Sequence, residues 1–173
     1  MRTATISLVI ASCLGLLSAQ GRGQDKPPAA AAGLERFKQL AGDWVGKGNH
    51  DGAEHDALIN YKVTSGGTAV VETIDPGGAH EMVTVIHPDG DALLLTHYCM
   101  IGNQPQMKAQ PKPGDNKVAF EFVKATNLKS DKDMHMRNVT FTFVDKDTLI
   151  TEWTNYDQGK EAGKAIFTLK RKR

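Results

Sequence analysis

The chain has 173 residues, with 21 basic and 20 acidic side chains, a formal net charge of +1 and room for a single domain. This balance leaves no basic stripe to hold a nucleic-acid backbone, and the basic run at residues 170–173 is too short to supply one. Cys13 and Cys99 are too few for a disulfide framework, so a hydrophobic core must hold the fold.

The N-terminus has the pattern of an export signal. Arg2 precedes the apolar run ISLVIASCLGLL at residues 6–17, which has signal-peptide length and is too short to span a bilayer. Small residues follow, so we predict a signal peptide over residues 1–19, cleavage near Ala19, and a periplasmic or secreted mature protein without a membrane span. The alternative is a lipoprotein box, IASC, that would anchor the chain through an acylated Cys13.

Two short segments precede the main domain pattern. Residues 20–33 are rich in Pro, Ala and Gly and show no apolar periodicity, which predicts a flexible linker. The predicted domain covers residues 34–173. At its start Leu34, Phe37 and Leu40 are spaced three apart, which favours a short amphipathic helix over residues 34–40.

The rest of the chain reads as strands separated by short Gly-, Pro- and Asp-containing turns. Consecutive strands with short links are typical of an up-and-down antiparallel meander. A flat meander of this size would expose two edges, so we predict an all-β, closed antiparallel barrel with one short N-terminal helix. About ten strands are expected, near residues 43–49, 56–64, 67–74, 80–87, 91–100, 105–110, 116–124, 135–144, 148–156 and 162–170.

The segment LAGDWVGKG at residues 40–48 carries a family resemblance. Its Gly-x-Trp, placed between a short helix and the first strand, resembles the entry motif of the calycin superfamily of lipocalin-like barrels. The longer Gly-x-Trp-x-Gly-x-Gly resembles the nitrobindin-like branch, and the whole pattern is similar to uncharacterised exported bacterial barrels. The resemblance implies that Trp44 plugs the closed end of the barrel, where glycines let the strand bend.

The nitrobindin resemblance also implies a haem, held by a histidine from a late strand. The predicted late strands, residues 149–156 and 162–170, contain no histidine. Haem binding is therefore not transferred to this chain, and no cofactor is predicted.

The stretch LLLTHYCMIGNQPQM at residues 93–107 is the first candidate for a ligand site. Alternation from Leu93 and Leu95 places His97 and Cys99 on the inner face and Tyr98 on the outer face. An inward histidine needs a partner or a ligand. We expect this strand to face a cavity, with rim amides and adaptable apolar contact from Asn103, Gln104 and Met107.

Further polar residues share the predicted inner face. His135 and Arg137 alternate with Val139, and Glu72 alternates with Val70. Such groups at one end of an apolar cavity suit a ligand with an oily body and a polar or anionic head. A mutually paired polar mouth without any ligand is the alternative. The predicted ligand-binding residues are His97, Cys99, Asn103, Gln104, Met107, His135, Arg137, Glu72 and Trp44.

Sulfur and imidazole side chains recur in the sequence, as His80-x-Met82, His97-x-Cys99-Met100, Met107 and Met134-His135-Met136. Such soft ligands suit Cu(I). However, they are spread over several strands, and in a regular strand Met134 and Met136 point away from His135. No metal site is therefore predicted.

The sequence contains no recognisable arrangement of catalytic residues. His97 and Cys99 lie two apart on one strand, without a third group to orient them, so no catalytic residue is predicted. The pattern favours an exported, non-catalytic module that binds a small apolar or amphipathic molecule. The alternatives are a structural or interaction barrel with a filled interior, a haem- or copper-binding barrel, and an enzyme. The oligomeric state is not indicated.

Overall fold

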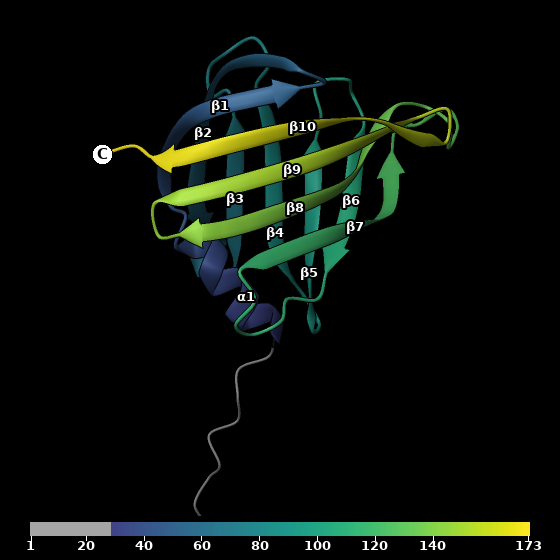
Figure 1. Ribbon diagram of the computed structural model, residues 1–173. Helices are drawn as coiled ribbons and strands as arrows, with labels where there is room; N and C mark the ends of the chain where they lie inside the picture. Colours follow the sequence, from purple (N-terminus) through teal and green to yellow (C-terminus); the bar gives the residue numbers. More distant parts are fainter. Residues whose placement is uncertain (1–28) are drawn as a thin grey trace, which may run out of the picture.

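The computed structural model describes residues 29–173, which form a closed ten-stranded antiparallel barrel with one α-helix (Figure 1). The predicted signal peptide, Cys13 and residues 20–28 of the predicted linker lie outside the described residues. The elements are α1 (Ala29–Lys38), β1 (Gly42–His50), β2 (Ala53–Thr64), β3 (Ala69–Ile74), β4 (Met82–Asp89), β5 (Ala92–Tyr98), β6 (Gln104–Ala109), β7 (Lys117–Thr126), β8 (His135–Asp145), β9 (Thr148–Asp157) and β10 (Lys160–Arg171).

The topology is that of a simple meander. Each strand pairs antiparallel with the next one in the chain, and β1 closes the barrel by pairing with both β2 and β10. Closure removes both sheet edges. The predicted fold class is confirmed, and all ten predicted strands are present. No helix within residues 29–173 is long and apolar enough to cross a membrane.

The helix begins earlier than the sequence analysis placed it. It starts at Ala29, inside the predicted linker, with four consecutive alanines. Alanine has the highest helix propensity of all residues, which explains the earlier start. Ala30 and Gly33 are buried, so this first turn packs against the barrel. Residues 29–33 therefore belong to the domain and not to a flexible linker.

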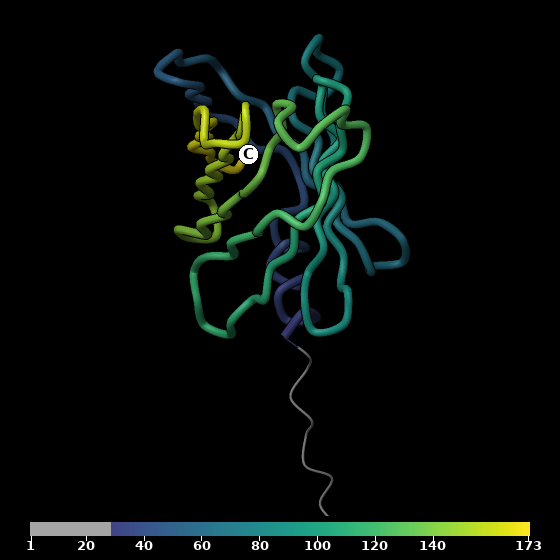
Figure 2. Tube along the Cα trace, turned by 90° about the vertical axis from the view of Figure 1, so that its right-hand side faces the viewer, coloured from purple at the N-terminus to yellow at the C-terminus, as the bar shows by residue number. Residues whose placement is uncertain are grey.

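The helix closes one end of the barrel, as two views at right angles show (Figures 1 and 2). Phe37 is fully buried and makes edge-on contacts with Phe120, Phe141 and Phe143, at centroid distances of 6.0, 5.0 and 5.4 Å. Such aromatic pairs stabilise the fold by more than the burial of their apolar area alone. The helix thus supplies the central ring of an aromatic cluster at the closed end.

Trp44 and Arg171 fasten the same end. The indole Nε1 of buried Trp44 donates to the carbonyl oxygen of Leu40 at 2.7 Å. The Arg171 guanidinium lies 4.5 Å from the Trp44 ring and donates to the carbonyls of Gln39 (2.7 Å) and Ala41 (2.9 Å). These bonds satisfy carbonyls of the short segment that links α1 to β1. Trp44 therefore lies at the closed end, as the resemblance implied.

Along β5 the predicted alternation is confirmed. Leu93 and Leu95 are 0% exposed and His97 is 1% exposed, whereas Tyr98 is 51% exposed. The inward residues of the other strands are likewise buried, among them Ile59, Tyr61, Val118, Phe120, Val139, Phe141, Phe167 and Leu169.

Candidate functional site

The end of the barrel opposite α1 holds a cavity of about 360 Å³, here called the mouth pocket. In a meander every second turn lies at the same end, and this end collects the β1–β2, β3–β4, β5–β6, β7–β8 and β9–β10 connections. The lining residues lie in these connections or on the strands that flank them: His50, His55, His80, Met82, Cys99, Met100, Ile101, Met134, His135, Met136, Asn155, Ala165 and Phe167.

The lining has an unusual composition. Four of the six histidines and four of the six methionines of the chain meet in this one cavity. The rest of the wall is mainly apolar, and the lining contains no Asp, Glu, Lys or Arg among the described residues. The mouth pocket is therefore an apolar, sulfur- and imidazole-rich hollow.

His135 is the most strongly positioned polar group of the mouth pocket. It is 2% exposed, and its ring lies 4.9 Å from that of Phe122. Its Nδ1 is 2.7 Å from the carbonyl oxygen of Asp133, which can only accept, so Nδ1 carries the proton. In the neutral ring Nε2 then has a free lone pair, and this buried atom has no partner within the described structure.

The loop before β8 fixes the Asp133 carbonyl in place. The Asp133 carboxylate accepts from the backbone N–H of Lys129 (2.7 Å) and from the Ser130 hydroxyl (3.0 Å). These hydrogen bonds lower the pKa of the Asp133 carboxyl. The Lys132 carbonyl accepts from the backbone N–H of Gln158 at 2.8 Å, which ties the loop to the β9–β10 turn.

The methionines beside His135 do not follow regular alternation. Met134 precedes β8, and the pairing of β8 with β9 is irregular between Met136 and Asn138. Met134, His135 and Met136 nevertheless all line the same cavity. The sequence argument that separated these three residues assumed a regular strand.

Two predicted rim residues connect the loops of the mouth. The side-chain amide of buried Asn103 donates to the carbonyl of Met134 at 2.8 Å, while its own Oδ1 has no partner. Gln104 is half-buried at the start of β6, where its Oε1 accepts from Thr126 at 2.7 Å. The Gln104 Nε2 also donates to the Gly102 carbonyl at 3.0 Å, so both amides bond the backbone, and Asn103 links the β5–β6 and β7–β8 connections.

A row of polar side chains crosses the inner wall on β2 to β5. Tyr61, Glu72, Thr84 and His97 occupy paired positions on these four strands. The Tyr61 hydroxyl donates to Glu72 Oε1 at 2.6 Å, and Thr84 Oγ1 is 2.9 Å from His97 Nδ1. All four residues are at most 1% exposed. They form two hydrogen-bonded pairs inside the barrel.

Burial shifts the ionisation of this row. Desolvation lowers the pKa of His97 to about 4, so the ring is neutral at pH 7. Desolvation raises the pKa of Glu72, and the Tyr61 hydroxyl partly opposes that shift. Three buried polar atoms nearby lack partners, namely Glu72 Oε2, Thr151 Oγ1 and Trp153 Nε1. Buried polar atoms of this kind normally meet a water or a ligand atom.

The structure brings only some predicted site residues to the mouth. Cys99 and His135 line the pocket, and Asn103 and Gln104 lie beside it. His97 and Glu72 lie inside the barrel, Met107 is fully buried in the core, and Trp44 is at the closed end. Their contact with a ligand stays a prediction.

Arg137 departs from its predicted alternation. It falls at the irregular point of β8 and is half-buried, with its guanidinium 4.7 Å from the Phe122 ring and 4.8 Å from the Tyr156 ring. It is therefore held between two aromatic rings and is not part of the inward series led by Val139.

His50 and His55 were missed by the sequence reasoning. Both flank the β1–β2 turn, and His55 lies edge-on to Phe167 at 6.1 Å. The predicted strand order contained the signal, because turns of one parity share one end of a meander. Grouping the turns in that way places His50, His55, His80 and Met100 together.

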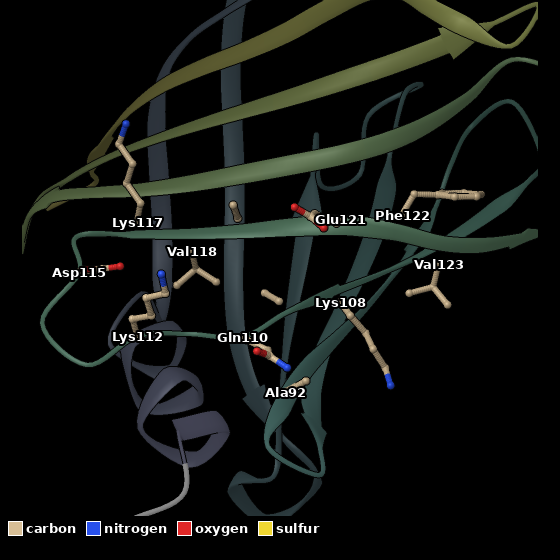
Figure 3. A pocket seen from close by; sticks show the side chains of 12 residues that line it. Ala92, Lys108, Gln110, Lys112, Asp115, Lys117, Val118, Glu121, Phe122 and Val123 are labelled. Carbon is tan, nitrogen blue, oxygen red and sulfur yellow. The ribbon is translucent and has the colours of Figure 1, made fainter.

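A second hollow lies outside the barrel, between β6 and β7, and is called the outer groove (Figure 3). It arises because β7 pairs with β8 through Lys117–Phe120 and with β6 only from Glu121 onward. The volume of the outer groove is about 640 Å³. Its lysines do not converge on one point, since Lys108 and Lys117 extend in opposite directions. None of the buried unpartnered atoms of the described residues lines it.

Comparisons with known proteins add information on the fold. No protein-family model matches the chain, and no curated protein matches it. The structure is similar to that of Rv2717c from M. tuberculosis, with a TM-score of 0.61 and 12% identity over 81% of this chain and 97% of that one.

A second similar structure is a protein with unknown function from the DUF3598 family of Nostoc punctiforme. The TM-score is 0.55 at 13% identity, and the match covers 79% of this chain. This chain spans about half of that protein, since 48% of it is covered. At such identities both likenesses show a shared barrel fold alone.

Proposed function

We propose that this protein is an exported binding module that takes a small, mostly apolar molecule into the mouth pocket. The observation that carries the proposal is the buried, unpartnered Nε2 of His135 in an otherwise apolar hollow. An apolar cavity with a few convergent polar groups is the usual form of a small-molecule site.

The tautomer of His135 indicates the polar group of the ligand. Nε2 accepts a hydrogen bond, so a hydroxyl or amine on the ligand satisfies it. Asn155 is 4% exposed, lines the same pocket and has an unpartnered Oδ1, which also accepts. The ligand therefore carries an apolar body and at least one hydrogen-bond donor.

Titration with the fluorescent probe N-phenyl-1-naphthylamine tests the proposal, because this probe is apolar and has one N–H donor. We expect one probe per chain with enhanced emission. Ala165 lines the mouth pocket, and Ala165→Trp fills part of it, so affinity should fall about tenfold or more. Ala119 lines the outer groove instead, and Ala119→Trp should leave affinity unchanged.

The paired variants also separate the alternatives. Equal affinities of both variants and the parent protein, or no probe binding at all, would leave a structural barrel with a filled interior as the better account. Loss of binding in Ala119→Trp alone would move the site to the outer groove. Native mass spectrometry of protein from its own host then identifies a retained ligand.

A further inference from the structure

The mouth pocket also has the chemistry of a soft metal site. Thioether sulfur and imidazole nitrogen are the ligands that suit Cu(I), whereas hard divalent ions require oxygen. The cavity gathers four thioethers and four imidazoles, and no carboxylate lines it among the described residues. The fold thereby removes the reason for which a metal was rejected from the sequence, since the scattered ligands share one cavity.

His135 has the arrangement of a metal-binding histidine. Such residues nearly always donate the other ring N–H to a carbonyl or carboxylate, which fixes the tautomer and the ring orientation. Here Nδ1 donates to the Asp133 carbonyl at 2.7 Å, and the Nε2 lone pair is buried, unpartnered and part of the cavity lining. The supporting carbonyl belongs to a loop with its own hydrogen bonds.

The remaining ligands must include sulfur. Within residues 29–173 no three His, Cys, Asp or Glu side chains lie close enough together to hold a metal ion. We propose that the mouth pocket binds one Cu(I) ion through Nε2 of His135 and the thioethers of Met82 and Met136.

Methionine can complete such a site by local movement. Its side chain has three rotatable bonds, so it adapts to a partner without a change in the backbone. Met82 and Met136 are half-buried and line the cavity wall, whereas Met100 and Met134 are 56% and 40% exposed at its rim. The rim methionines therefore shield the ion after it binds.

Cys99 is not required as a ligand. The three proposed donors, one imidazole nitrogen and two thioether sulfurs, are all neutral, and such a donor set suits a monovalent soft ion. The inference goes beyond the proposed function but uses the same Nε2 lone pair of His135, so Cu(I) and a hydrogen-bonding organic ligand are expected to compete for it.

Competition for Cu(I) against a chromogenic chelator tests the inference. The full mature protein with Cys99→Ser is titrated under nitrogen with ascorbate, so that the Cys99 thiol does not contribute to copper binding. We expect one Cu(I) per chain. His135→Ala and the double variant Met82→Leu/Met136→Leu should each lose affinity about tenfold or more, since changes even in the supporting shell of a metal site have effects of this size.

Matched controls come from the same chain. His87 is half-buried on β4, its Nδ1 also contacts a carbonyl, that of Pro88 at 2.9 Å, and it does not line the mouth pocket. Met107 is fully buried in the core and lies outside the pocket lining. His87→Ala and Met107→Leu should bind Cu(I) as the parent does.

The outcomes are distinct from those of the organic-probe experiment. X-ray absorption spectra at the copper edge should show nitrogen and sulfur atoms bound to the ion, with fewer sulfur atoms in the double methionine variant. No copper uptake, or equal affinity in the test and control variants, would overturn the metal site while leaving the probe result intact. If His135→Ala does not fold, the conservative methionine variants still decide, because Met-to-Leu changes preserve volume.

Discussion

The two ends of the barrel are built from different chemistry. At the closed end Phe37 packs among three rings, and both the Trp44 indole and the carbonyls after α1 have hydrogen-bond partners. At the mouth His135, Asn155 and Asn103 each retain a buried atom without a partner. From this contrast we expect the closed end to contribute more to stability, and the proposed binding site lies at the other end.

The largest expected effect is at the closed end. Phe37→Ala removes a fully buried ring and leaves a cavity within the aromatic cluster, so the free energy of unfolding should fall by about 4 kcal/mol. Met136→Leu at the mouth should change it by less than about 1.5 kcal/mol. Chemical denaturation measures both. A mouth variant as destabilised as Phe37→Ala would break the distinction between the ends.

The polar row between the two ends makes stability depend on pH. The folded-state pKa of His97 is about 4, below the ordinary value of 6.5, so the unfolded chain takes up a proton first as pH falls. The stabilisation is complete above pH 6.5, is lost between pH 6.5 and about 4, and amounts to about 3 kcal/mol. Glu72, whose pKa is raised, acts in the opposite direction because its folded form favours the proton.

Two variants isolate the histidine contribution. In Glu72→Gln the opposing carboxyl is absent, and the free energy of unfolding should fall from pH 7 to pH 4. In Glu72→Gln/His97→Gln the part of this fall that His97 causes should mostly disappear. Exposed carboxylates contribute equally to the pH dependence of both variants. Urea denaturation at several pH values gives the difference. Parallel curves would show that His97 is not held in its neutral form by burial.

The closed end and the barrel wall were largely predictable from sequence. Turn residues separated the ten strands, and strict alternation identified inward residues such as Leu95 and Phe141. These signals are local, and a closed meander follows from short links. The start of α1 was missed because Ala29 to Ala32 offer no apolar periodicity, although alanine propensity alone supports a helix there.

The mouth was less predictable because it depends on relations between distant turns. His50, Met82 and Met134 are far apart in sequence, and only the barrel topology brings them into one cavity. Local alternation also failed at Arg137, where an irregular pairing of β8 and β9 changes the direction of side chains. A bulge of this kind has no clear signature in a single strand sequence.

The smallest expected effect concerns two glycines of β1 that lie between the ends. A methyl group at Gly46 would overlap the backbone carbonyl of Thr168 on β10, so Gly46→Ala must displace a strand. We expect a loss of about 2 kcal/mol in the free energy of unfolding. At Gly48 the methyl would first meet the imidazole of His55, a side chain at the mouth that can rotate away.

Gly48→Ala should therefore change the free energy of unfolding by less than about 1 kcal/mol, since a surface side chain and not the backbone gives way. It should nevertheless alter the mouth, because a displaced His55 changes the wall beside Phe167. Thermal unfolding and probe affinity, measured on both variants, separate the two effects. If Gly48→Ala is the more destabilised of the pair, then the backbone of β1 is constrained as tightly at the mouth as toward the closed end, and the division of roles between the ends does not hold along this strand.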